Sequence, residues 1–230
     1  MMIRYLVLGG MICLLLYSCG GKKQAVQKKT EPSTIYINPN NEVAIAGAVN
    51  FDDEESLSIY SAILKNVTGD KSGAYIGNKM DRLANYFENN LDYSDLLRAG
   101  EGVILEFDSY SNFKFNTGKT TLNSESKDIL NSIILTLQQH KKVNLIIETH
   151  TDASGDEEVN MKLSQDRVQA IENYLVENGI ENIRIKTKAF GESQPKVNND
   201  TAENRKLNRR IEFGFYASEA LKEEAKTATQ

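Results

Sequence analysis

The feature that most constrains this chain is the alternation of strand-like and helix-like patterns in its C-terminal half. Residues 143–150, VNLIIETH, form a short apolar run typical of a strand in the middle of a sheet. Residues 124–139 place apolar side chains at helical spacing. Strands alternating with helices imply helices packed on a sheet. We therefore expect an α+β fold, a two-layer α/β sandwich of βαβαββ type.

The strand-like and helix-like patterns of apolar residues also give the element boundaries of this sandwich. Strands are expected at 103–107, 143–150, 184–190 and 210–216, and residues 112–115 form a second short strand or continue the first. Helices are expected at 124–139, 160–178 and 201–208. Asn123 or Ser124 caps the first helix, and Gly179 ends the second, as glycine commonly does after a last helical turn.

Two further helical patterns precede the sandwich. From Asp52 onward, Ile59, Ile63 and Val67 recur four residues apart, and a glycine end signal follows them. Residues 73–91 form a second amphipathic pattern. Together these patterns predict a small helical hairpin, which would have to pack on another part of the chain to bury its apolar face.

The N-terminus has the pattern of an export signal. A positively charged start is followed by an apolar run at residues 5–17, which is shorter than the 20 or so residues that span a membrane. Its end, Leu16-Tyr17-Ser18-Cys19, resembles the lipobox of bacterial lipoproteins. The resemblance implies removal of residues 1–18 and a diacylglycerol on Cys19. A plain signal peptide with a chance cysteine, or an uncleaved anchor, remains the alternative.

The segment after Cys19 indicates where the chain resides and how it is divided. Residues 20–34 are rich in lysine and poor in apolar side chains, which predicts a solvated tether. An Asp directly after the lipidated cysteine is the usual inner-membrane retention signal of some Gram-negative lipoproteins. This chain has Gly20 there, which favours the outer membrane, with the domain facing the periplasm. The expected organisation is a signal peptide (1–18), lipidated cysteine and tether (19–34), helical segment (35–99), sandwich domain (100–217) and polar tail (218–230).

A set of residues in the sandwich segment resembles the OmpA-like C-terminal domain family. The shared pattern is a His-Thr-Asp turn, an Asn-x-x-Leu-Ser-x-x-Arg helix start, a Gly-x-x-x-Pro loop and a closing Asn-Arg-Arg. In this chain it is carried by His150-Thr151-Asp152, Asn160, Leu163-Ser164, Arg167, Gly191, Pro195 and Asn208-Arg209-Arg210. The resemblance implies non-covalent binding of peptidoglycan through the diaminopimelate of its stem peptide, with no cofactor.

The resemblance carries over Asp152 and Arg167 as the ligand-binding pair, and the chemistry of the ligand agrees. Diaminopimelate presents an ammonium and a carboxylate on one carbon. A carboxylate acceptor and a planar, bidentate guanidinium would suit these two groups. Arg167 falls on the apolar side of its predicted helix, where a charge needs a partner. The alternative is that Asp152 and Arg167 form an ion pair inside the fold.

Other site residues follow from the resemblance. Thr151 and Asn160 would contact the ligand or order the loop, and their alternative roles are a turn hydrogen bond and a helix N-cap. Arg209 would reach the ligand carboxylate, whereas Arg210 is expected to be a solvated strand residue. The backbone of residues 116–118 would line the pocket. Thr149 and Asn204 stand where the family usually has glycine, so they would narrow the pocket or shift a loop.

Composition and missing motifs narrow the function classes. The net charge of −5 gives no support to a nucleic-acid partner, and two histidines exclude a His-rich metal centre. Cys13 and Cys19 both lie near the N-terminus, so the body of the chain holds no disulfide. His150, Asp152 and Ser154 have the residue types of a hydrolytic triad, but the sequence has no Gly-x-Ser-x-Gly elbow. We therefore expect that the chain is not an enzyme. His150 is expected to be structural.

The expected partners are therefore peptidoglycan and outer-membrane lipid, the latter through acylated Cys19, with other envelope proteins as further candidates. Two other functions stay open as alternatives. One is a periplasmic enzyme that acts on the cell wall, and the other is a structural subunit of an envelope complex.

Overall fold

The computed structural model describes residues 59–64, 68, 70–91 and 95–230, all within one unit that spans residues 32–230. The expected signal peptide, Cys19 and the tether lie outside the described residues, as does the glycine end signal at Gly69. None of the helices in the described ranges is long and apolar enough to cross a membrane.

The described residues form one five-stranded sheet in the order β1-β2-β5-β3-β4. The strands are β1 (Asp95–Ala99), β2 (Gly102–Phe107), β3 (Val143–His150), β4 (Ile185–Gly191) and β5 (Ile211–Ala217). Strands β3 and β4 are parallel, and the other neighbours are antiparallel. The predicted central strand therefore lies between β5 and β4. Strand β1, which the sequence pattern did not predict, forms a hairpin with β2 through Gly100, whose φ of 52° suits glycine.

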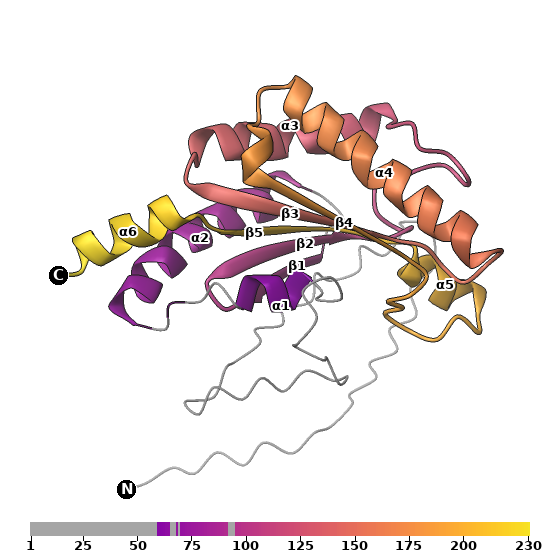
Figure 1. Cartoon of the computed structure of the whole chain (residues 1–230), viewed down its shortest axis with the longest axis horizontal. Coiled ribbons are helices and arrows are strands. Elements are labelled where there is room, and N and C mark those ends of the chain that lie inside the picture. Colours follow the sequence, from indigo (N-terminus) through magenta and orange to yellow (C-terminus); the bar gives the residue numbers. More distant parts are fainter. Residues whose placement is uncertain (1–58, 65–67, 69, 92–94) are drawn as a thin grey trace, which may run out of the picture. The chain divides into compact units, whose positions relative to one another are not determined.

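Helices cover the sheet on both faces (Figure 1). They are α1 (Ile59–Leu64), α2 (Lys71–Asn90), α3 (Ser124–Gln139), α4 (Glu157–Glu177), α5 (Ala202–Asn208) and α6 (Glu219–Ala228), with a 3₁₀ turn η1 at Asn182–Arg184. Helix α3 has the predicted bounds and is capped by the Asn123 side chain. Helix α4 begins three residues earlier than predicted because Asp156 accepts hydrogen bonds from the Glu158 and Val159 N–H groups as its N-cap.

The two sheet faces carry two separate apolar clusters. On the face covered by α2, α3 and α4, the main core includes Leu105, Leu145 and Phe213. The opposite face holds a smaller cluster beneath α1, in which Ile59 and Ile63 pack against Ile104, Ile146 and Tyr216. Successive strand residues point to opposite faces, which explains why both faces can be apolar in one strand. The α+β two-layer core is thus confirmed, with α1 added on the second face.

The predicted helical hairpin is wrong. Helix α2 contributes Met80 and Phe87 to the main core, whereas α1 packs on the other face. Gly214 makes the α1 contact possible, because a Cβ there would lie 2.6 Å from Ile59. Each helix buries its apolar side against a different face of the sheet, so the two helices do not have to pack on each other.

Residues 112–115 do not form a strand. They lie in an irregular connection between β2 and α3, in which Phe113 is buried against Phe107 and Phe213. A side chain can enter the core from a loop without strand pairing, which the apolar pattern alone does not distinguish. The expected polar tail forms α6, which buries Leu221 and Ala225 in the main core.

Candidate ligand-binding site

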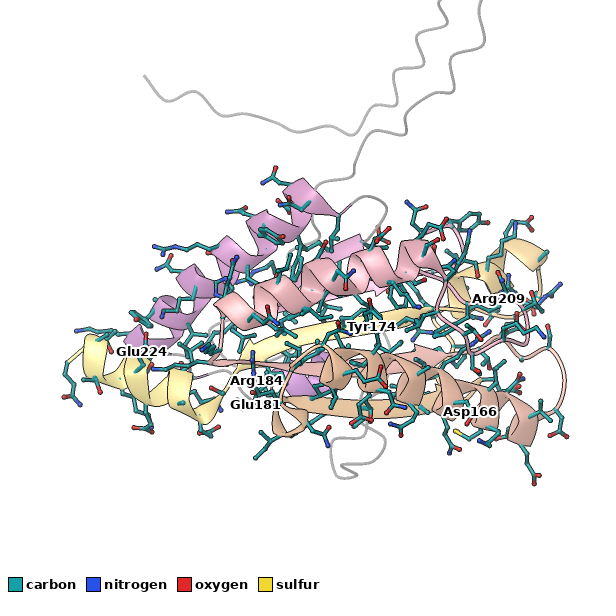
Figure 2. The ribbon with its side chains drawn as sticks, turned by 90° about the horizontal axis from the view of Figure 1, so that it is seen from above. Asp166, Tyr174, Glu181, Arg184, Arg209 and Glu224 are labelled. Atoms are coloured by element: carbon teal, nitrogen blue, oxygen red, sulfur yellow. The ribbon has the colours of Figure 1, made fainter. Side chains whose placement is uncertain are left out.

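A cavity of about 640 Å³ opens at one end of the sheet, where β3 ends. Its walls come from the connection between β2 and α3, the residues after β3, the first half of α4 and the end of α5. Figure 2 shows Arg209 at this end of the sheet, beside α5. The same cavity is lined by all five predicted ligand-binding residues: Asp152, Thr151, Asn160, Arg167 and Arg209. The volume lies in the range of small-ligand pockets.

Asp152 follows β3 and is held by two groups of the protein. Its Oδ1 accepts a hydrogen bond of 2.8 Å from the Ser154 N–H, and its Oδ2 accepts one from the Arg209 guanidinium. Burial alone would raise the pKa of Asp152, but the hydrogen bonds from Ser154 and Arg209 outweigh burial and lower it. Asp152 is therefore a fixed anion at neutral pH.

Arg167 projects from α4 into the wall of the cavity and is only 8% exposed. Its Nε donates to the Lys119 carbonyl at 3.1 Å and its Nη2 to the Asn116 carbonyl at 3.3 Å. The guanidinium also lies over the Phe115 ring, 5.2 Å from the centroid. Burial lowers the pKa of Arg167 to about 10, so the side chain stays protonated at neutral pH. The loop that was expected to line the pocket thus positions this cation.

The structure does not form the internal Asp152–Arg167 ion pair. Asp152 pairs with Arg209 instead. Within the described ranges, Arg167 has no ion pair with any carboxylate. A nearly buried guanidinium whose hydrogen bonds go only to neutral carbonyls is suited to receive an anion.

Asn160 and Thr151 take different places. The Asn160 amide donates to the Asp152 and Ser154 carbonyls and, at 2.5 Å, to the Glu192 carboxylate. It therefore ties the loop after β3 to the end of β4, and Asp156 rather than Asn160 caps the helix. The Thr151 hydroxyl is buried and has no hydrogen-bond partner among the described residues.

Arg210 is not the solvated residue that was expected. It is 8% exposed, and its Nε donates to Glu212 at 2.7 Å. The prediction failed because the loop after β4 covers this part of the second sheet face, where the Gln194 carbonyl accepts from Arg210.

A row of buried glutamates lies behind the cavity on the second sheet face. Glu106, Glu212 and Glu148 are paired in register across β2, β5 and β3. Burial, with the neighbouring Glu212, raises the pKa of Glu148 to about 8 and also raises the pKa of Glu106. Lys196 forms an ion pair with Glu106. Glu148 is thus protonated at neutral pH, and the row carries less charge than its composition suggests.

His150 belongs to the same buried region. Its ring stacks on Phe190 with centroids 5.1 Å apart, and burial, with Arg210 nearby, holds the pKa of His150 well below its usual range.

Two residues that replace family glycines are accommodated. The Thr149 hydroxyl donates to the Ser164 carbonyl at 2.8 Å, so its side chain is bonded to α4 at the cavity wall. The Asn204 N–H donates to the Thr201 hydroxyl in the first turn of α5.

Sequence reasoning missed Ser109, Tyr110 and Lys206, which also line the cavity. Ser109 Oγ contacts Arg209 Nε at 3.2 Å, and the Lys206 ammonium lies 5.1 Å from the centre of the Tyr110 ring. These residues sit in a loop and a short helix without a periodic pattern, so no sequence signal could have found them.

Comparison with known proteins agrees with this geometry. The model of the OmpA family matches residues 114–209, which contain the cavity residues of β3, α4 and α5. These residues are an OmpA-family domain. The predicted family resemblance is thereby confirmed for this part of the chain.

Relatives of the OmpA-family domain include proteins named as lipoproteins. The chain is 30% identical over 116 residues to "Probable lipoprotein YiaD" of Escherichia coli, a match that covers 50% of this chain and 52% of the relative. It is 28% identical over 130 residues to "Peptidoglycan-associated lipoprotein" of Buchnera aphidicola, covering 56% and 69%. The chain thus spans about half the length of the Escherichia coli relative.

Among solved structures, the fold of the OmpA-family domain is similar to that of a MotB-like protein from Desulfovibrio vulgaris. The TM-score is 0.56 at 22% identity, over 64% of this chain and 94% of the other. This likeness supports the fold.

Proposed function

We propose that this chain is an outer-membrane lipoprotein that anchors the membrane to the cell wall by non-covalent binding of peptidoglycan, through the diaminopimelate of the stem peptide. One observation carries the proposal. Arg167, a nearly buried cation without a carboxylate partner among the described residues, shares an open cavity with the ionised Asp152. Opposite charges held apart in one cavity suit a ligand that carries both charges itself.

The carboxylate and the ammonium at the free end of diaminopimelate would each have a partner in this cavity. Its carboxylate would accept from Arg167, whose carbonyl contacts at Asn116 and Lys119 fix the plane of the guanidinium. Its ammonium would donate to Asp152, which Arg209 and the Ser154 N–H already orient. Thr151 lines the same cavity, and its buried hydroxyl has no hydrogen-bond partner among the described residues.

The anchoring half of the proposal rests on the N-terminus and on the relatives. The lipobox-like end at Cys19 would place two or three acyl chains in a membrane, which gives stable attachment where one chain would not. The Buchnera aphidicola relative is named as a peptidoglycan-associated lipoprotein, which supports the same pairing of lipid and wall.

Co-sedimentation with purified sacculi tests wall binding. Full-length protein in detergent should pellet with diaminopimelate-type sacculi and much less with lysine-type sacculi, because lysine lacks the carboxylate that Arg167 would bind. Asp152→Asn should weaken binding at least about tenfold. Asp166→Asn is the matched control, since Asp166 lies on α4 and pairs with Lys162 (Figure 2). Equal pelleting with both wall types, or normal binding by Asp152→Asn, would refute the proposal.

Metabolic labelling tests the lipid anchor. Cells grown with labelled palmitate should label the protein, and Cys19→Ala should remove the label because the thiol is the attachment point. Label that persists on the Cys19→Ala protein would exclude the lipobox interpretation, without any consequence for the wall-binding site.

A further inference from the structure

The cavity carries more positive charge than a single ammonium–carboxylate end can match. Among the described residues that line it, five cations face two carboxylates, Asp108 and Asp152. The cations are Lys114, Arg167, Lys206, Arg209 and Arg210. The excess is local, because the whole chain has a net charge of −5. A positively lined cleft in an acidic protein attracts anionic ligands.

The protein itself neutralises only part of this excess. Arg210 pairs with Glu212 behind the cavity, and Arg209 pairs with Asp152. Within the described ranges, Lys114, Arg167 and Lys206 form no ion pair. A zwitterion bound at Arg167 and Asp152 adds no net charge, so Lys206 would keep its positive charge unmatched.

Lys206 is held in place at the rim of the cavity. Its carbonyl accepts a hydrogen bond of 3.3 Å from the Ser109 N–H, which joins α5 to the connection after β2. Its ammonium lies over the ring of Tyr110, which is 55% exposed. The Tyr110 N–H in turn donates to Asp108 Oδ1 at 2.8 Å, so the turn that presents the ring is fixed. An ammonium that already lies over a ring loses less entropy on binding than that of a free lysine.

Lys206 also lies next to the proposed site. It lies in the last turn of α5, and Arg209 is the C-cap of that helix, so both residues line the cavity from the same end of α5. Ser109 contacts both residues, through its N–H to Lys206 and its hydroxyl to Arg209. A ligand group beside the one bound at Asp152 would therefore meet Lys206.

We propose that Lys206, seated on Tyr110, is a second anion subsite that binds another carboxylate of the same stem peptide. The proposal rests on the proposed function, since it assumes that the stem peptide occupies the cavity. Two carboxylates are candidates: the α-carboxylate of the D-glutamate that precedes diaminopimelate and the C-terminal carboxylate of the D-alanine that follows it. Both present the same chemistry to Lys206.

Calorimetry with synthetic stem tetrapeptides tests the subsite. Full-length protein in detergent is titrated with the parent peptide, with a peptide amidated at the glutamate α-carboxyl, and with one amidated at the C-terminus. We expect one amidation to weaken binding about three- to tenfold, and Lys206→Gln to weaken binding of the parent by a similar factor. The Lys206→Gln protein should no longer respond to that amidation, which identifies the carboxylate. Lys206→Arg should restore most of the affinity.

A matched control and the opposing outcomes complete the test. Lys127 also lies over a tyrosine ring, that of Tyr174, but outside the cavity, so Lys127→Gln should bind like the wild type. Normal binding of the parent peptide by Lys206→Gln, or equal binding of all three peptides by the wild type, overturns the subsite and leaves the Arg167 site intact. A wild type that binds neither the peptides nor sacculi overturns the proposed function and the subsite together.

Discussion

Charged side chains gather at both ends of the sheet, but they do so in opposite ways. Figure 2 labels Glu224 on α6 at one end and Arg209 beside the cavity at the other. Glu224 accepts hydrogen bonds from Tyr75, Lys79 and Lys142, which lowers its pKa to about 2. One carboxylate is thus saturated by donors from α2 and from the turn before β3. At the cavity end the cations outnumber the carboxylates.

The difference separates a cluster whose charges are matched within the chain from a cluster that keeps a positive excess. A saturated group joins the elements that contribute to it, as Glu224 joins α6 to α2. An unsaturated buried cation is costly unless something else completes it. The excess at the cavity end therefore supports the proposed binding of a ligand there.

Two arginines show the same contrast. Arg184 donates to the carbonyls of Leu137, His140 and Val143, at distances from 2.7 to 3.2 Å, and so caps the C-terminal end of α3. Arg167 has two carbonyl acceptors and faces the cavity. The first arginine completes the fold, whereas the second has binding capacity to spare.

Replacing each of these arginines by alanine should give the largest effects. One variant should mainly lose binding, and the other should mainly lose stability. Arg167→Ala should weaken sacculus binding by about 1.5–3 kcal/mol, roughly ten- to hundredfold, and lower the Tm by only about 2–4 °C. Arg184→Ala should lower stability by about 2–3 kcal/mol, because three carbonyls lose a charged donor, and leave binding unchanged. Calorimetric melting measures the stability of each variant, and co-sedimentation measures its binding to sacculi. A collapse in Tm for Arg167→Ala would break the comparison.

The buried glutamate row behind the cavity should give an intermediate effect that depends on pH. The folded pKa of Glu148, about 8, lies above its ordinary value of 4.5. Its contribution to stability is therefore fully present below pH 4.5 and is lost as the pH rises through 8. Glu148→Gln, which mimics the protonated side chain, should remove this loss, so that the variant is more stable than the wild type at pH 9.

Denaturant unfolding between pH 5 and 9 measures this effect. His150 acts in the opposite direction, since its lowered pKa makes stability fall as the pH drops below 6.5, and that part of the profile should persist in the variant. Parallel profiles for the two proteins between pH 5 and 8 would show that Glu148 is ionised in the folded state.

The smallest effect is expected at the saturated end. Glu224→Gln should lower the Tm slightly at low salt and less at high salt, because the lysines that it neutralises are partly exposed. Sacculus binding should not change. Scanning calorimetry at two salt concentrations provides the measurement, and reduced binding by this variant would mean that the two ends are coupled.

The regular elements were predictable because they rest on local periodicity. Helix 124–139 and strand 143–150 have the predicted bounds, since their apolar side chains repeat at the helical and strand periods and Asn123 supplies the cap. Arg210 was not predictable, because its burial depends on a loop from a distant part of the chain. The same holds for α1 and α2, whose amphipathic patterns do not say which sheet face each one covers.

Local spacing and motifs were enough to predict the fold class, the family pattern and the residue types of the candidate site, including Asp152 and Arg167. How the charges of these residues are matched depends on the three-dimensional arrangement of the chain. It paired Asp152 with Arg209, left Arg167 against neutral carbonyls and brought Lys206 to the rim. Ion pairing depends on distances between side chains far apart in the chain, and no local pattern encodes those distances.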